Sequence, residues 1–278
     1  MIAPTVVSFA TQWNHFGYSM FKRNWLDHVV KNTFGTTEAF RGKIIVDAGS
    51  GSGNQALWML EAGAKFVYLL ELSDSVFDAV KKTLEKTKYR NYAVIKCSID
   101  EPPLKMGLAD IVYCHNVIQH TPSVQNTAKA LFRLVRPGGE FVFNCYPLDD
   151  RGILRWIRFH LVYKTLRRIL SKLPFSGILA YAKLLGTLRL VPAIGWFLEK
   201  SGFCLCGNVP LNSFKKTFHQ TVLNTFDLFG SHEFQHHLRK VELIALLAEL
   251  QPDPLKIGNF EKYFKIPPPI GCALRVRK

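Results

Sequence analysis

The segment Lys43–Asn54, KIIVDAGSGSGN, constrains the fold of this chain more than any other stretch. Its apolar start predicts a buried strand over residues 43–46, and the glycines after Asp47 predict a tight turn that opens a helix. Glycine lets the backbone approach a ligand closely, and the start of a helix offers free N–H groups. The segment therefore predicts an α/β fold with a ligand site at this turn, suited to a phosphate, a dinucleotide or a nucleoside.

The spacing of the glycines and the strand that follows them restrict the kinds of ligand that the turn can bind. The last glycine of the dinucleotide fingerprint GxGxxG is replaced by Asn54, and no phosphate-binding lysine follows as in a P-loop. About twenty residues later, the run FVYLL over residues 66–70 predicts a second buried strand that ends at Glu71. An acidic residue there is placed to accept hydrogen bonds from ribose hydroxyls, in an NAD site or an adenosyl site.

Four segments in order, VDAGSGSGN, LLELS, ADIVYCHNVIQH and LVRPGGEFVF, resemble the motif series of the class I S-adenosylmethionine-dependent methyltransferases. The resemblance covers residues 43–145. It implies an α/β, Rossmann-like sheet of seven strands flanked by helices, in the order 3-2-1-4-5-7-6 with the last strand antiparallel. It also implies S-adenosylmethionine as cofactor, with S-adenosylhomocysteine as product. The cofactor-binding residues that it implies are Asp47, Ala48, Gly49, Gly51, Glu71, Leu72, Ser98, Ile99, His115 and Asn116.

One position departs from the family pattern. Ser98 stands where the family usually has an acid that meets the adenine amino group, so either Asp100 substitutes for it or the contact is weaker. Apolar runs predict further strands over residues 92–97, 109–114, 140–145, 255–259 and 271–276. Helical periods and the Arg-Pro-Gly-Gly stop predict helices over residues 74–88, 127–135 and 242–250, and the pair Thr121-Pro122 predicts that the second of these begins near residue 121.

These elements define four parts of the chain. Residues 1–42 form an N-terminal arm or lid, and residues 43–146 form the S-adenosylmethionine-binding core. Residues 147–232 form a helical insertion after the fifth strand, and residues 233–278 complete the core. The arm resembles an F-x-x-x-W-x-x-F segment of bacterial methyltransferases that covers the cofactor, and Trp13, His15, Phe16 and Tyr18 either line the active site or pack the arm onto the sheet.

Candidate acceptor-side groups follow from the same comparison. His120 comes just after the fourth strand, and an imidazole near neutrality can remove a proton from an acceptor. The alternative is a histidine that only orients the loop or the cofactor carboxylate. Asp227 and His232, in TFDLFGSHEFQHH, match acidic and histidine positions that fold back toward the acceptor in similar proteins. The spacing of these histidines, without a carboxylate cluster, predicts no metal site.

The positive charge of the chain lies in its second half. Residues 1–150 have 16 Lys or Arg and 14 Asp or Glu, whereas residues 151–278 have 20 and 7. The helical spacing of apolar residues over 152–173 predicts a helix with one apolar face and one basic face. The apolar face contains Trp156, Phe159, Tyr163, Leu166, Leu170 and Leu173. The insertion is thus either a lid over a small-molecule acceptor or, through residues 151–200, a contact with an anionic membrane that admits a lipid-like acceptor. Charges and breaks within residues 178–198 argue against a spanning helix, and nucleic acid is a disfavoured partner.

Together these patterns predict a methyltransferase acting on an O or N atom, less readily C, of a small molecule, lipid or glycan. Two alternatives stay open: a catalytically silent adenosyl-binding or membrane-associated scaffold subunit, and an NAD-dependent oxidoreductase. Six cysteines without a CxxC pair indicate a reducing compartment, and no secretory leader is recognisable at residues 1–13. We therefore expect a protein that is either free in the cytoplasm or attached peripherally to a membrane. The sequence does not predict the oligomeric state.

Overall fold

A computed structural model describes residues 34, 36–148, 150–201, 214–230, 232–251, 253, 257–259 and 272–278. The chain divides into two compact units. The core unit comprises Phe9–Leu148 and Phe234–Lys278, and the helical unit contains Asp149–Glu233 together with Met1–Ser8. The aromatic residues predicted to line a lid, Trp13, His15, Phe16 and Tyr18, lie outside the described residues.

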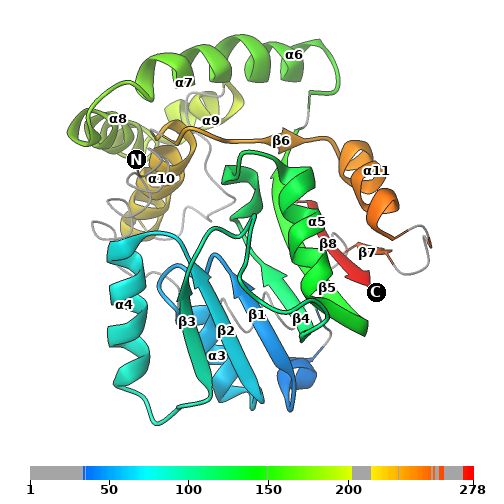
Figure 1. Cartoon of the computed structure of the whole chain (residues 1–278). Coiled ribbons are helices and arrows are strands. Elements are labelled where there is room, and N and C mark those ends of the chain that lie inside the picture. The colour runs from blue at the N-terminus through cyan, green and yellow to red at the C-terminus, as the bar shows by residue number, and fades with distance from the viewer. Residues whose placement is uncertain are drawn as a thin grey trace. The chain divides into compact units, whose positions relative to one another are not determined.

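The core unit is built on one sheet, whose strands lie in the order β3-β2-β1-β4-β5-β8-β7 (Figure 1). The strand β8 is antiparallel to both of its neighbours, and the other pairs are parallel. The short strand β6 (His237–Leu238) lies outside this order, so β7 and β8 are the sixth and seventh strands of the expected sheet. The order 3-2-1-4-5-7-6 expected from the resemblance is therefore confirmed. The strands are β1 (Ile44–Ala48), β2 (Phe66–Glu71), β3 (Tyr92–Lys96), β4 (Ala109–Cys114), β5 (Val135–Pro147), β7 (Ile257–Asn259) and β8 (Cys272–Arg277).

Helices cover both faces of this sheet, which explains why the central strands are apolar throughout. Neighbouring residues of β1 point to opposite faces. Ile45 packs in a cluster with α3 (Asn54–Glu61) and α4 (Asp74–Glu85). Val46 packs in a second cluster with α5 (Val124–Leu134) and α11 (Lys240–Leu250), and α5 lies on the near face in Figure 1.

Several predicted boundaries are shifted in the structure. The helix α5 begins at Val124 rather than near Thr121-Pro122, because Ser123 caps it by accepting a hydrogen bond from the Asn126 amide. The strand β5 begins at Val135 rather than residue 140. Its Pro-Gly-Gly segment lies in a register shift against β4, where a Cβ on Gly139 would lie 2.7 Å from the Asp110 carbonyl oxygen. The glycines therefore form a bulge within the strand, not a stop before it.

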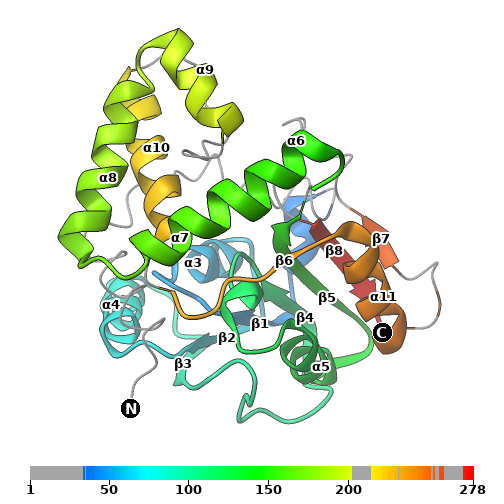
Figure 2. The same ribbon diagram turned by 90° about the horizontal axis from the view of Figure 1, so that it is seen from above.

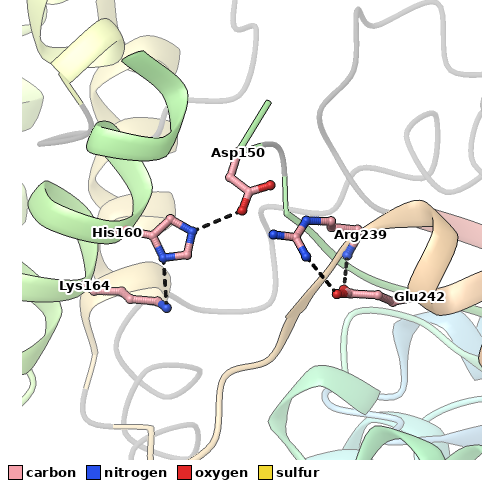
Figure 3. Close-up of polar contacts among 5 residues, drawn as sticks. All are labelled: Asp150, His160, Lys164, Arg239 and Glu242. Atoms are coloured by element: carbon pink, nitrogen blue, oxygen red, sulfur yellow. Dashed lines mark hydrogen bonds and ion pairs between the residues drawn. The ribbon is translucent and has the colours of Figure 1, made fainter. Parts of the chain in front are cut away.

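A short strand, β6 (His237–Leu238), was not predicted. It pairs in parallel with the end of β5, where Tyr146 lies opposite His237. A strand of two residues has no alternation that a sequence could reveal. The helix α11 starts just after it, and there the Arg239 amide and guanidinium both donate hydrogen bonds to the Glu242 carboxylate (Figure 3).

The helical unit contains α6 (Ile153–Trp156), the π-helix η4 (Ile157–Tyr163), α7 (Lys164–Leu170), α8 (Phe175–Leu188), α9 (Pro192–Ser201) and α10 (Phe214–Phe229). Figure 2 shows α6 to α7 as one continuous run and α8 beside α10. Tyr163 and Leu170 pack against Phe229, with Phe159 and Leu166 beside them, as the predicted apolar face requires.

Two other members of the predicted apolar face do not pack in that cluster. Trp156 is 43% exposed and Leu173 is 39% exposed. The π-helical turn rotates the residues before it relative to an α-helix, and Leu173 lies beyond the end of α7. The apolar run 178–198 is split between α8 and α9. None of the helices in the described part of the chain is long and apolar enough to cross a bilayer.

Candidate functional site

The glycine turn after β1 is fastened to the end of β2. The amides of Gly49 and Ser50 both donate to the Leu70 carbonyl, at 3.0 and 3.1 Å. Gly49 has φ +78°, and a Cβ at this position would lie 2.5 Å from both Cγ atoms of Val117, in the loop after β4. Glycine is therefore required for two reasons, the backbone conformation and the close approach of that loop.

Glu71, at the end of β2, holds the turn through its carboxylate. Its Oε2 accepts from the Gly51 amide at 3.1 Å, and its Oε1 accepts from the amides of Leu72 and Ser73 at 3.0 and 2.9 Å. Burial raises the pKa of Glu71, and these three hydrogen bonds oppose the rise. A carboxylate has about four acceptor positions, so Glu71 retains capacity for a hydroxyl donor from a ligand.

Asp47, at the end of β1, is the second acid of the site. Its side chain is buried, and its Oδ2 has no hydrogen-bond partner within the described part of the chain. Burial first, and the nearby charge of Glu71 second, raise the pKa of Asp47 to about 7. A buried oxygen of this kind costs free energy unless a donor reaches it. The two carboxylates thus favour a ligand that brings hydroxyl or ammonium groups.

His115 and Asn116 follow β4 at the same edge of the sheet. The Nδ1 of His115 lies 3.5 Å from Gln55 Nε2 of α3, and burial lowers the pKa of His115 to about 4, so its ring is neutral near pH 7. Asn116 has φ +58°, the left-handed conformation. Its amide donates to Asn144 Oδ1 at 2.7 Å, and Asn144 Nδ2 donates back to Asn116 Oδ1. This reciprocal pair ties the loop after β4 to β5.

Asn144 was not selected from the sequence as a site residue. An asparagine inside the apolar run FVFNC is a signal, since buried amides require partners. Replacing it, Asn144→Ala, leaves the Asn116 amide without its acceptor and frees the left-handed residue. We expect the affinity for S-adenosylmethionine, measured by calorimetry, to fall about tenfold. Asn91→Ala is the control, because Asn91 donates to the carbonyls of Ala64 and Lys65 elsewhere in the core unit and should change stability alone.

The remaining cofactor-site candidates contribute in different ways. Ala48 and Ile99 lie in the apolar cluster under α5, whereas Leu72 is 44% exposed. Ser98 Oγ donates to Asp100 Oδ2 at 3.3 Å, and Thr127 of α5 donates to the other oxygen of Asp100. The Asp100 carboxylate therefore has two hydroxyl donors from the protein itself.

His120 lies in the 3-10 turn η3 (Ile118–His120) and is buried. Its Nδ1 lies 3.1 Å from the Phe234 carbonyl oxygen, which assigns the ring proton to Nδ1, and its ring meets Tyr146 edge to face. The neighbouring Gln119 is fully buried, and its amide group has no partner among the residues described. His236 also joins this loop, because its amide donates to the Gln119 carbonyl at 2.8 Å.

Asp227 and His232 belong to the helical unit rather than the core unit. His232 is buried, and its Nε2 lies 4.0 Å from Asp227 Oδ1. The Arg167 guanidinium donates to the carbonyls of Leu228, in the last turn of α10, and of Gly230 and His232, which follow that helix. The structure therefore places these two candidates near each other, at the end of one helix, and His120 in a different unit. Among the described residues, no group of three His, Cys, Asp or Glu side chains is arranged to bind a metal ion.

Comparisons with known proteins agree with this geometry. Residues 46–143 match the family described as "Methyltransferase domain". A ubiquinone biosynthesis O-methyltransferase of Nitrosospira multiformis is 30% identical over 117 residues, 41% of this chain and 47% of that protein. Protein arginine N-methyltransferase 1 of Oryza sativa subsp. indica is 31% identical over 108 residues, 36% of this chain and 27% of that protein. The chain thus spans about half, or less, of the length of these curated relatives.

Solved structures are similar at lower identity. A SAM-dependent methyltransferase from Aquifex aeolicus is 13% identical and aligns with a TM-score of 0.43, over 52% of this chain and 76% of that one. The strand order and the matched family together define the class of the core. The chain carries a methyltransferase domain with the class I, Rossmann-like fold.

The cofactor of this class of domain is S-adenosylmethionine, and the described residues fit it. The unpartnered Oδ2 of Asp47 and the remaining acceptor capacity of Glu71 suit hydroxyl and ammonium donors. The turn at Gly49 offers a surface of backbone without a Cβ, at the start of α3. Asp47, Gly49, Gly51 and Glu71 are thus the residues that would hold the cofactor.

Proposed function

We propose that this chain transfers a methyl group from S-adenosylmethionine to an oxygen or nitrogen atom of a small-molecule, lipid or glycan acceptor. The observation that carries the proposal is the pair of carboxylates, buried Asp47 and partly buried Glu71, on either side of a glycine turn in a matched methyltransferase domain. The names of two relatives, an O-methyltransferase and an arginine N-methyltransferase, favour an O or N acceptor over carbon.

The bound cofactor supplies a methyl group on a positively charged sulfur. An acceptor atom displaces the sulfur from the methyl carbon, with the three atoms in line. The chain's own residues then have three tasks: to hold the donor, to align the acceptor and to exclude water. The glycine turn and Glu71 hold the donor. Neutral His115 adds no positive charge beside a cationic ligand. His120, whose ring proton is on Nδ1, presents a basic Nε2 that can take the acceptor's proton.

Binding of the cofactor should depend on Glu71. In Glu71→Ala, the affinity for S-adenosylmethionine and S-adenosylhomocysteine should fall about a hundredfold, since hydrogen bonds from ribose hydroxyls to a carboxylate contribute about 1.5–3 kcal/mol each. Isothermal titration calorimetry measures this loss. Glu71→Gln keeps the volume and part of the acceptor capacity, and thermal unfolding monitored by circular dichroism reports whether either variant is folded. Glu85→Ala, an exposed acid on α4, should bind like the parent chain.

Two alternatives have distinct outcomes in the same titration. Tight binding of NAD, with no heat from either adenosyl ligand, would contradict the proposal and favour an NAD-dependent oxidoreductase. Binding of S-adenosylmethionine with no transfer of its labelled methyl group to any component of a lipid, glycan or metabolite extract would favour a silent adenosyl-binding subunit. Label transfer that is lost in His120→Ala, with cofactor binding retained, would assign the acceptor side to His120.

A further inference from the structure

The helical unit exposes apolar side chains on the same helical run that carries its basic residues. Ile153 and Leu154 of α6 are 70% and 79% exposed, Leu161 of η4 is 54% exposed and Ile169 of α7 is 59% exposed. These residues are not needed for the packing of the unit, because Tyr163 and Leu170 on the opposite side of the run already pack against Phe229. The run thus has a second apolar side that faces solvent.

A second group of exposed apolar residues lies on α9. Trp196 is 63% exposed and Phe197 is 57% exposed, and Val191 just before the helix is 49% exposed. Single exposed apolar residues are common on protein surfaces, but large ones gathered in one segment indicate a contact surface. The described residues of the core unit offer a comparison, since fewer of their large apolar side chains are exposed, among them Met106 and Val241.

The charge around these residues is mainly positive. Residues 151–201, which reach the end of α9, contain ten Lys or Arg and one acid, Glu199. The side chain of the neighbouring acid, Asp150, is 6% exposed, and its Oδ2 accepts a hydrogen bond from His160 Nε2 at 3.1 Å, while Lys164 Nζ donates to His160 Nδ1 at 3.2 Å (Figure 3). Three of the ten, Lys164, Arg167 and Arg189, make hydrogen bonds inside the unit or are buried in it. The exposed apolar side chains therefore lie in a segment with an excess of cations over acids.

We propose that the run Ile153–Leu170 and the helix α9 lie in the interfacial plane of an anionic lipid bilayer. Such a surface buries the leucine, isoleucine and tryptophan side chains at the level of the headgroups and supplies negative charge to the arginines and lysines. The proposal concerns the helical unit alone and does not depend on methyl transfer.

Charge complementarity selects the bilayer over other occupants. A second copy of this chain would bring ten cations against ten cations, with one acid, Glu199, in each segment to pair with them. Nucleic acid would satisfy the cations, but it would leave exposed side chains such as Leu154 and Leu161 beside a charged phosphate backbone. An anionic bilayer matches both the apolar and the basic side chains. The helices lie on this surface and do not cross it, in keeping with their length and charge.

Co-sedimentation of the full chain with vesicles tests the proposal. One set of vesicles contains phosphatidylcholine alone, and the other contains 30% phosphatidylglycerol. We expect about a hundredfold tighter binding to the anionic vesicles, since each basic residue near the surface contributes roughly a factor of five. Binding should weaken when the salt concentration is raised from 0.1 to 0.5 M.

Two pairs of substitutions separate the apolar and electrostatic contributions. Leu154→Ser with Leu161→Ser removes apolar surface at constant charge and should weaken binding to anionic vesicles at least thirtyfold. Arg168→Gln with Lys172→Gln should weaken it about 25-fold. The matched controls are Val241→Ser and Lys82→Gln with Lys86→Gln, at exposed positions of the core unit, and they should change binding less than twofold.

Three results would overturn the proposal. Equal binding to neutral and anionic vesicles would remove the role of charge, and no binding to either would remove the surface itself. The third is concentration-dependent self-association in sedimentation equilibrium that disappears in the Leu154→Ser and Leu161→Ser variant, which would make the patch an interface between copies. Circular dichroism at 222 nm, unchanged in all variants, distinguishes a lost contact from a lost fold.

Discussion

Gly49→Ala should lower the free energy of unfolding by roughly 3 kcal/mol and the affinity for S-adenosylmethionine about a hundredfold. The left-handed φ of +78° costs a residue with a Cβ about 1–2 kcal/mol. The Cβ would also lie 2.5 Å from two carbons of Val117, and relieving such a contact in a packed region costs about 1–3 kcal/mol more. A shift of the turn misplaces the backbone that meets the cofactor. Urea unfolding and calorimetry measure the two effects.

Gly138→Ala is the matched control for this variant. Gly138 has φ +75°, but no heavy atom lies within 4 Å of a Cβ built on it, so only the cost of the backbone conformation remains. We expect a loss of about 1–2 kcal/mol in stability and unchanged cofactor affinity. A double-mutant cycle of Gly49→Ala with Val117→Ala should give a favourable coupling of about 1–2 kcal/mol. Equal effects of Gly49→Ala and Gly138→Ala would show that the contact with Val117 does not matter.

Asp47→Asn should make the protein more stable at pH 8 while weakening its binding of the cofactor. The folded chain raises the pKa of Asp47 from 3.8 to about 7. Between these two values the folded protein binds a proton that the unfolded chain has lost, so the stability of the parent chain falls as the pH rises through this window. The expected change from pH 5 to pH 8 is roughly 3 kcal/mol, at about 1.4 kcal/mol per pH unit below 7. The asparagine variant lacks this dependence.

The measurement is the difference in unfolding free energy between Asp47→Asn and the parent chain, from urea unfolding at pH 5, 6, 7 and 8. Other titrating groups cancel in the difference. Cofactor binding should have the opposite dependence, because hydroxyl and ammonium donors prefer the ionised carboxylate, so the affinity of the parent chain should rise as the pH approaches 7. A Glu71→Gln background should shift this transition to lower pH, since the Glu71 charge is the second cause of the raised pKa. A stability difference that is flat with pH would contradict the buried, ionisable state of Asp47.

Much of the core could be predicted from local patterns. The apolar runs and the glycine turn specify β1 and β2 and their order, because a buried parallel strand has to be apolar on both faces. The resemblance supplied the strand order that the structure confirms. The boundary errors at α5 and β5 have local causes that the pattern did not weigh, a serine cap and a glycine bulge.

The partners of the site residues could not be predicted in this way. Asn116 meets Asn144, 28 positions later, and His120 meets the carbonyl of Phe234, 114 positions later. The strand β6 exists only because β5 offers it an edge. Such contacts depend on how distant segments pack, and no local period records them. The exposed apolar side of α6 to α7 could not be predicted from the α-helical spacing either, because a π-helical turn changes which residues share a face.

The sequence by itself determined the class of the core, the position of the cofactor turn and the excess of positive charge between residues 151 and 198. These depend on residue type and on spacings of a few residues, which act through backbone conformation and hydrophobic burial. Only the tertiary structure decided that burial raises the pKa of Asp47 to about 7, which loop forces Gly49 to be glycine and which apolar side chains face solvent. Those properties arise from burial and from contacts between distant segments, and both appear only when the chain has folded.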